Sequence, residues 1–361
     1  MPKSVRSPVD SKLPSTSVVD DPGIPTLATI LDPDELAKHL EGPSVSRSSG
    51  TAREVRVRVL KWHVAKRCTF EIVLGTGLIG KVYATDRPDV YQVMERLVQA
   101  GFGPEAEFSI PQPIAYLPSL RLLLQEKVEG ARAKDILLVG DEHQRALVAE
   151  RCARWLARFH ALAPPSGKLI DVEKILGGSE RKCCLLCEEG GPLAAKSKQL
   201  FERLRAAAPS LSTIPLCASH GHSISTGDFL LGPPLGTMPL SADHGRFGSY
   251  QVVLGEGRTV VFDWDVYNTA DPARDVAGFI LSLERQALRR FGSIRALDDA
   301  TALFLETYLN AGRHPEVAAR LPFYKAAHCM RSANWEDRTK SAGWSGRAEA
   351  MLEEGLRTLG Q

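Results

Sequence analysis

The sequence lacks the features that mark several specialised classes of protein. No stretch approaches the roughly eighteen consecutive apolar residues of a membrane span, and the first residues have no apolar segment of the kind found in a secretory signal peptide. Neither sign of charge dominates, because 45 Lys and Arg face 43 Asp and Glu, which argues against nucleic acid or an anionic membrane as a partner. The seven cysteines are odd in number, which favours reduced thiols over a disulfide framework. We therefore expect a cytoplasmic protein.

What the sequence does contain is enough apolar residues for a sizeable core. Of its 361 residues 43% are hydrophobic, which fits one large or two medium domains. Residues 1–52 are the exception, because Ser, Pro, Gly, Asp and Arg dominate them. Such a composition buries too little apolar surface to offset the entropy of ordering. We expect a largely disordered extension over 1–52, with one short helix near 32–40 and globular structure from about Arg53.

Two regions of different periodicity follow. Residues 53–126 contain short apolar or alternating runs that predict strands, and one helix begins at Pro88. Residues 127–361 are chiefly helical, with a long amphipathic segment over 147–162. Further helical patterns cover about 190–207, 276–291, 297–311, 315–333 and 345–359. The stretch 208–240 is rich in Gly, Pro and Ser, which predicts a long loop or insertion.

The stretch from 244 to 275 is the most informative part of the chain. It reads His-Gly-Arg-Phe at 244–247, then Gln251 before an aliphatic run, a Gly-Glu-Gly turn, and Thr-Val-Val-Phe-Asp-Trp-Asp at 259–265. A β-branched run that ends in a carboxylate holds that carboxylate rigidly, as a magnesium site for phosphoryl transfer requires. The sequence therefore predicts Asp263 as a metal ligand, with the amide of Gln251 as a second oxygen ligand.

This stretch resembles the aminoglycoside phosphotransferase and choline kinase-like family. The family signature is His-Gly-Asp-Phe/Leu, a nearby Asn or Gln, an aliphatic strand, Asp-x-Asp/Glu and Asp-Pro-x-x-Asp, and the last part matches 271–275. The resemblance covers about 53–340 and implies an α+β, two-lobed protein-kinase-like fold. A small antiparallel-sheet N-lobe would span 53–126 and a larger, mostly helical C-lobe 127–361. It also implies ATP and Mg²⁺ as cofactors and a small-molecule acceptor, and it leaves the oligomeric state open.

The resemblance assigns nucleotide-binding roles to the N-lobe. Lys81 would hold the nucleotide phosphates, because a compact cation on a rigid strand can meet phosphate oxygens; an ordinary exposed lysine is the alternative. Glu95, on the predicted helix, would pair with Lys81 or else is a solvated charge. Glu126 and Val128 lie in the segment that would bind adenine through backbone groups.

One residue departs from the family pattern. Where the family has its catalytic Asp, this chain has Arg246, which stays protonated and offers only hydrogen-bond donors. It cannot accept the proton of an acceptor hydroxyl, so the sequence predicts weak or altered catalysis with nucleotide binding retained. Asp228 and Asp243 are nearby carboxylates that could compensate, but both are interpreted as loop residues. Two functions follow: a phosphotransferase for a small polar molecule, or a pseudokinase that binds nucleotide without transfer.

Further residues around the motif have supporting interpretations. His244 is expected to shape the catalytic loop, and Asp265 either assists the metal ligand or caps a loop. Asp271 and Asp275 flank the start of a helix, where Asp commonly serves as a cap. His160, at the end of the long amphipathic segment, is interpreted as a structural brace.

Two other motifs could indicate different functions, dinucleotide binding and zinc binding. The sequence Gly75-Thr76-Gly77-Leu78-Ile79-Gly80 matches G-x-G-x-x-G, but a strand rather than a helix follows it, which favours a hairpin turn over a Rossmann oxidoreductase. The cluster Cys183-Cys184-Leu185-Leu186-Cys187, with His220 and His222 downstream, has irregular spacing for zinc. Reduced thiols are the preferred interpretation of that cluster.

Overall fold

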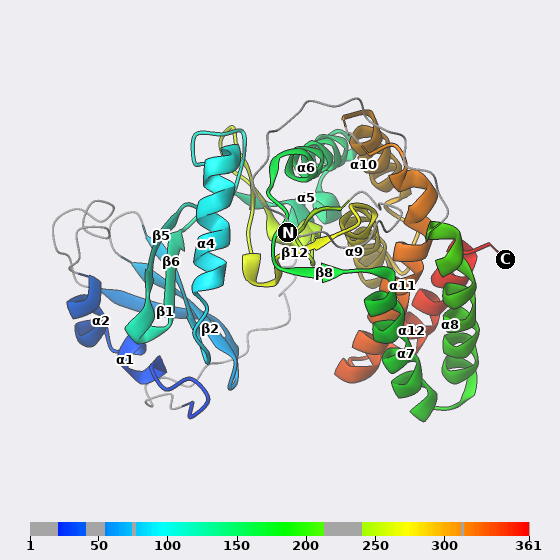
Figure 1. Ribbon diagram of the computed structural model, residues 1–361, viewed down its shortest axis with the longest axis horizontal. Helices are drawn as coiled ribbons and strands as arrows, with labels where there is room; N and C mark the ends of the chain where they lie inside the picture. The colour runs from blue at the N-terminus through cyan, green and yellow to red at the C-terminus, as the bar shows by residue number, and fades with distance from the viewer. Residues whose placement is uncertain (1–20, 41–54, 74–76, 213–239, 312–313, 361) are drawn as a thin grey trace, which may run out of the picture. The chain divides into compact units, whose positions relative to one another are not determined.

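The computed structural model describes residues 21–40, 55–73, 77–212, 240–311 and 314–360. The chain divides into two compact units, Met1–Tyr91 with Pro113–Lys127, and Gln92–Gln112 with Val128–Gln361 (Figure 1). α4 (Pro88–Leu97) runs across the boundary, and its start agrees with the predicted helix. None of the helices within the described ranges combines the length and apolar character that a membrane span requires.

The first unit is built on an antiparallel sheet. Its described strands follow the order β1 (Arg56–His63), β2 (Arg67–Val73), β3 (Leu78–Tyr83), β6 (Leu122–Glu126) and β5 (Pro113–Leu117). Phe70 and Val82 are fully buried in the core on one face, and a Cβ at Gly80 would lie 2.4 Å from the Phe70 ring. Because side chains alternate along a strand, Lys81, between Gly80 and Val82, projects from the opposite face.

Residues 21–40 belong to this unit. The prediction that globular structure begins near Arg53 is therefore wrong for this segment. They form α1 (Leu27–Leu31) and α2 (Pro33–Leu40), the second of which matches the short helix expected near 32–40. Their buried apolar residues join the sheet core: Ile24, Leu27, Ile30, Leu36 and Leu40. Burial against the sheet therefore orders a segment whose local composition does not predict order. The rest of the expected extension, 1–20 and 41–54, lies outside the described residues.

The glycine motif at 75–80 connects two strands of this sheet. β2 and β3 are antiparallel neighbours, with Ile72 opposite Leu78, and Gly77 adopts φ +73° in the left-handed region that favours glycine. Residues 74–76 of the connection lie outside the described part. A dinucleotide-binding turn leads into a helix and a parallel strand, so the antiparallel pairing excludes the Rossmann alternative and agrees with the predicted hairpin.

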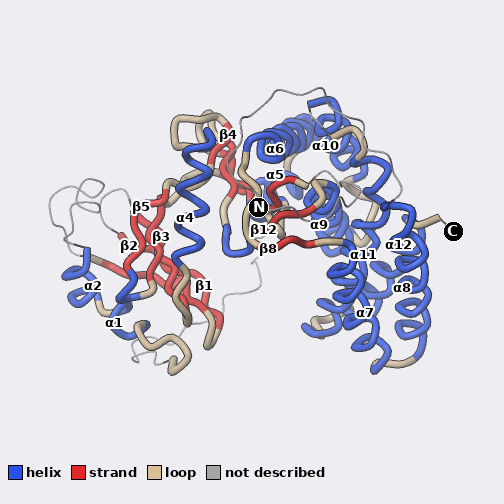
Figure 2. The backbone as a smooth tube through the Cα atoms, viewed as in Figure 1, coloured by secondary structure: helices blue, strands red, loops and turns tan. Residues whose placement is uncertain are grey.

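The second unit is mostly helical. Its longer helices are α5 (Ala133–Val139), α6 (Glu142–Leu162), α7 (Val172–Glu188), α8 (Gly191–Ser212), α9 (Ala273–Phe291), α10 (Asp298–Ala311), α11 (Val317–Thr339) and α12 (Trp344–Thr358). Helices α7, α8, α11 and α12 lie side by side (Figure 1), and α10 packs along α6 (Figure 2). Five of the expected helical patterns coincide with α8 to α12, whereas α7 was not predicted as a helix. α8 occupies the start of the expected 208–240 loop, and 213–239 lie outside the described residues.

Short strands of the second unit form two small sheets. One has the order β4 (Phe108–Ser109), β11 (Thr259–Val261), β10 (Val252–Leu254) and β7 (Ala131–Arg132). The other has the order β8 (Lys168–Ile170), β12 (Asn268–Ala270) and β9 (Ser241–Asp243). The stretch 244–275 therefore runs from one sheet into the other and back, and ends at α9.

Candidate active site

The β10–β11 hairpin brings Gln251 and Asp263 to its open end. Val252 pairs with Val261, and the backbone N–H of Phe262 donates to the carbonyl of Gln251 at 3.1 Å, which extends the ladder by one step. The glycine turn closes the other end of the hairpin. The two residues predicted to hold magnesium thus flank the same end of one rigid element.

The side chain of Gln251 is buried without partners. It is 2% exposed, and neither its amide oxygen nor its amide nitrogen has a hydrogen-bond partner among the described residues. Leaving a buried polar group unsatisfied costs about 1–3 kcal/mol, so a ligand that satisfies it would offset a real penalty. An amide oxygen is also a hard donor of the type that Mg²⁺ accepts. Gln251 therefore fits the metal-binding role.

Asp263 has an unusual backbone conformation. Its φ of +75° and ψ of +59° lie in the left-handed region, which few residues other than glycine adopt. The bend ends β11 and starts the 3-10 turn η4 (Trp264–Val266), which carries Asp265. Such conformations cost of order 1–3 kcal/mol and cluster at functional sites. The conformation is an observation independent of the motif, and Asp263 shares positive φ among the described non-glycine residues with Ala65, Arg121 and Lys340.

The loop after β9 is fastened to both α9 and the hairpin. The backbone N–H groups of His244 and Gly245 donate to the carboxylate of Asp275, at 2.7 and 3.2 Å. The His244 ring lies 3.2 Å through Nε2 from the carbonyl of Phe262, and since a carbonyl only accepts, Nε2 carries the proton. His244 thus ties the loop to the residue before Asp263, which is the work of a positioning residue.

Asp275 is the anchor of this loop. It is 2% exposed. Burial alone would raise the pKa of its carboxyl, but the nearby His160, followed by the charges of His244 and Arg274, lowers that pKa. His160 lies 3.6 Å from Asp275 through Nε2 and contacts the Tyr308 hydroxyl through Nδ1 at 2.8 Å. These contacts agree with the brace predicted for His160.

Asp243 and Asp228 are the two carboxylates that could compensate for the predicted loss of the family's catalytic Asp. Asp243 ends strand β9 rather than lying in a loop, is 1% exposed, and accepts a hydrogen bond from Arg274. Burial and the charge of Asp275 raise the pKa of Asp243, against the opposing effect of Arg274. Its ion pair makes Asp243 a structural group, and Asp228 lies outside the described residues. Asp271 is structural as well, since the Nε of Arg320 donates to it at 2.5 Å.

Arg246 is exposed in this loop, between the buried residues Gly245 and Phe247. Its neighbour Phe247 is 1% exposed and stacks on Trp155 at 5.6 Å between ring centroids. The ring of Trp264, from the turn after Asp263, lies 5.9 Å from the same Trp155. One aromatic core therefore holds the Arg246 loop and the Asp263 turn. The predicted substitution of Arg246 for the family's catalytic Asp therefore lies in a loop that shares its aromatic core with the Asp263 turn.

The predicted nucleotide-binding residues are distributed over both units. Lys81 is 5% exposed on β3 of the first unit, where it pairs in register with Thr69 and Leu123. Glu126 ends β6, and the chain passes into the second unit between Lys127 and Val128. Glu95 is exposed on α4 in the second unit. The pairing of Lys81 with Glu95, and its approach to Asp263, remain predictions.

The described part of the chain has no cluster of the usual metal-ligating side chains. No three of its His, Cys, Asp or Glu side chains gather in a way that could hold an ion. Cys183, Cys184 and Cys187 are free thiols on α7, and His220 and His222 lie outside the described residues. The predicted pair Asp263 and Gln251 would not form such a cluster, because Mg²⁺ usually takes most of its ligands from water and bound phosphates.

Gly245→Ala tests whether the loop geometry depends on a glycine. Gly245 has φ +77°, and a Cβ would lie 2.6 Å from the carbonyl oxygen of Val266, so the loop must move. Gly257→Ala is the matched control, since Gly257 has φ +69° but nothing within 4 Å. We expect the free energy of unfolding to fall by about 1 kcal/mol for the control and by about 2–4 kcal/mol for Gly245→Ala, measured by urea denaturation. If both substitutions lower the free energy of unfolding by the same amount, the loop accommodates a Cβ at position 245 without additional cost.

A sheet-based unit, followed by a helical unit with this fastened loop and hairpin, defines a two-lobed kinase-like fold. Solved structures with the same fold include a thermostable aminoglycoside phosphotransferase variant in a ternary complex with ADP and hygromycin B, at TM-score 0.59 and 15% identity over 91% of this chain and 99% of that chain. They also include choline kinase from Cryptosporidium parvum Iowa II, at TM-score 0.56 and 10% identity over 87% and 93%. A choline/ethanolamine kinase family protein from Mesorhizobium loti aligns at TM-score 0.54 and 14% identity over 90% and 97%.

These likenesses confirm the predicted α+β kinase-like fold and, at the level of the fold, the resemblance to aminoglycoside phosphotransferases and choline kinases. No protein-family model matches the chain, and no curated protein matches it by sequence. The identities are low, so the activities of these proteins are not transferred with the fold.

Proposed function

We propose that the protein is an ATP-dependent phosphotransferase that acts on a hydroxyl of a small polar molecule. The observation that carries this proposal is the open end of the β10–β11 hairpin. There the buried, unpartnered amide of Gln251 stands beside a conformationally unusual Asp263. His244 links that end to the loop in which kinases of this family carry their catalytic Asp.

Each residue has a role in this proposal. Asp263 and Gln251 would hold Mg²⁺, which offsets the charge that develops on the phosphates of ATP. Lys81 would hold phosphate oxygens, and the segment with Glu126 and Val128 would bind adenine. Asp265 would support Asp263 from the following turn.

The second candidate function is a nucleotide-binding pseudokinase, and Arg246 is the observation that favours it. An arginine cannot accept a proton from the acceptor hydroxyl. Among the described residues, the nearest carboxylate in sequence, Asp243, is occupied by Arg274. General-base assistance contributes roughly 10²–10⁴-fold to such reactions. Transfer would then be slow or absent, whereas nucleotide binding would persist.

Both functions require MgATP binding at the hairpin, which Gln251→Met tests. Methionine keeps the approximate shape of glutamine but removes the unpartnered amide. We expect the ligand-free variant to be more stable than the wild type by about 1–2 kcal/mol, because a buried polar group without partners is removed. We also expect MgATP to raise its melting temperature by less than half of the several degrees expected for the wild type. Differential scanning fluorimetry with and without MgATP measures both effects.

Gln99→Met is the control for that measurement, because Gln99 is an exposed amide whose removal should change neither quantity. ATP with EDTA should give a smaller shift than MgATP in the wild type. If MgATP does not stabilise the wild type, both candidate functions are wrong.

A further inference from the structure

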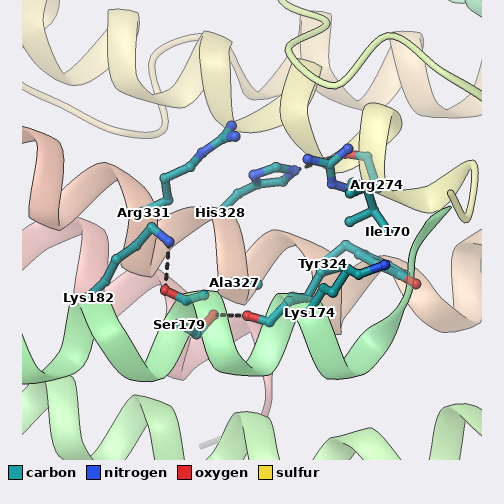
Figure 3. A pocket seen from close by; sticks show the side chains of 11 residues that line it. Ile170, Lys174, Ser179, Lys182, Arg274, Tyr324, Ala327, His328 and Arg331 are labelled. Carbon is teal, nitrogen blue, oxygen red and sulfur yellow. Dashed lines mark hydrogen bonds between the residues drawn. The ribbon is translucent and has the colours of Figure 1, made fainter. Parts of the chain in front are cut away.

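The helical unit contains a pocket of about 220 Å³ between α7, α9 and α11 (Figure 3). Its basic lining is Lys174 and Lys182 from α7, Arg274 from α9, and His328 and Arg331 from α11, and we call it the basic pocket. None of the described residues that line it is Asp or Glu.

The positive charges of this pocket are only partly offset. Arg274 is paired with Asp243, and Lys174 lies 4.0 Å from Asp171. Lys182 donates to the carbonyl of Gly178 at 2.6 Å, and no carboxylate of the described residues pairs with it. Arg331 has neither a hydrogen bond nor an ion pair within the described part of the chain. Figure 3 shows Arg331 on the same side of the pocket as His328 and Arg274.

The fold holds the lysine and arginine side chains of the pocket together against their mutual repulsion. Arg331 is an exposed residue of α11. Partial desolvation by the surrounding protein and the charges of Arg274, Arg246 and Arg285 lower its pKa to about 10. Arg331 therefore stays charged at neutral pH. Burial, with Arg331 and Arg274, lowers the pKa of His328 well below its usual value. A bound anion would relieve this unfavourable concentration of positive charge.

The basic pocket adjoins the loop that carries Arg246. Arg274, in its wall, is paired with Asp243, which directly precedes His244. His328 lies 3.0 Å through Nε2 from the carbonyl of Arg274. The charge of Arg246 acts on Arg331, so the loop and the pocket share one electrostatic environment. A ligand held in the pocket would lie near the loop where an acceptor hydroxyl is needed.

We propose that the basic pocket binds an anionic group, a phosphate monoester or a carboxylate, of the small molecule whose hydroxyl is phosphorylated. This inference rests on the proposed phosphotransferase function. Lys182 and Arg331 supply the unpaired charges, and Ser179 and Tyr324 add hydroxyl groups to the lining. The arrangement disfavours a cation such as choline or an aminoglycoside, which would meet like charge.

The size of the pocket limits what it holds. Pockets for whole drug-sized ligands begin at about 300 Å³, and this one measures about 220 Å³. It therefore suits one anionic group rather than a complete large antibiotic.

Isothermal titration calorimetry on the nucleotide-free, full-length protein tests the inference, with glycerol 3-phosphate and acetate as probes. We expect Arg331→Gln and Lys182→Gln each to weaken binding of the preferred probe about 10- to 100-fold, because each removes a charge-assisted hydrogen bond. Arg338→Gln, an exposed cation on the same helix, is the matched control and should leave the dissociation constant within about twofold. Stronger binding of glycerol 3-phosphate identifies a phosphate ester, and stronger binding of acetate a carboxylate. Absence of binding, or an unchanged constant in Arg331→Gln, overturns the inference.

Asp263→Ala separates this inference from the proposed function. It should leave anion binding intact, because Asp263 does not line the pocket. If the wild type is not stabilised by MgATP but anion binding depends on Arg331, the proposed function fails and the anion site stands without an acceptor role. If MgATP stabilises the protein and Arg331→Gln binds the probes as the wild type does, the pocket proposal alone fails.

Discussion

Asp263→Ala is expected to abolish phosphoryl transfer, with a loss of about a thousandfold or more. A bound metal contributes several kcal/mol of charge stabilisation to the transition state, and each 1.4 kcal/mol changes a rate about tenfold. Asp263 is the first carboxylate after β11, and Asp265 follows in the next turn. The rate of ATP-dependent phosphorylation, measured with an anionic acceptor and with water as acceptor, checks the expectation.

Glu256→Ala is the control for this prediction. Glu256 is an exposed carboxylate in the turn at the opposite end of the same hairpin, so its loss changes the charge equally but leaves the metal site intact. We expect its rate to equal that of the wild type. If Asp263→Ala retains the wild-type rate, magnesium is not held at the hairpin end and the proposed site is wrong.

Arg246→Asp is expected to raise turnover by about 10²–10⁴-fold, the usual contribution of general-base assistance. The loop is already fastened through the backbone of His244 and Gly245 to Asp275, so the substitution alters an exposed side chain without disturbing the anchor. An aspartate there can accept the proton of an acceptor hydroxyl, whereas the arginine only donates. Steady-state kinetics with saturating MgATP measure the change.

Arg246→Ala distinguishes gain of a base from mere loss of a positive charge. It should bring little or no increase in turnover, because alanine accepts no proton. A large increase in both variants would show that the arginine only obstructs the acceptor. No increase in Arg246→Asp, together with MgATP binding, would favour the pseudokinase over the phosphotransferase.

The local parts of the site were predictable from the sequence. Gln251, the glycine turn and Asp263 form one strand-turn-strand segment, and the periodicity of such a segment predicts its register. The left-handed backbone of Asp263 had no sequence signal, because Asp adopts this conformation only occasionally and no glycine marks the position. The hydrogen bonds from the backbone of His244 and Gly245 to Asp275 also had no sequence signal. The motif gives the order of these residues along the chain but not which of them contact each other.

The order of segment 21–40 could not be predicted from the sequence, because it depends on contacts with residues far away in the chain. Its helices, Leu27–Leu31 and Pro33–Leu40, are too short to be stable alone. They are ordered because Leu27, Ile30 and Leu36 are completely buried with the sheet core. The composition of a short segment does not show whether its apolar residues will be buried against a distant sheet.

By itself the sequence indicated a strand-rich region followed by a helical one, and a strand-turn-strand segment between Gln251 and Asp263, because strand alternation, glycine turns and helical periodicity act between near neighbours. The kinase-like fold was implied by the family resemblance of 244–275. Only the tertiary structure decided that Lys182, Arg274 and Arg331 line one pocket. They come from helices far apart in the chain, and each is an ordinary cation in its own segment. Helix packing brings them together, and the resulting excess of positive charge is what indicates an anionic ligand.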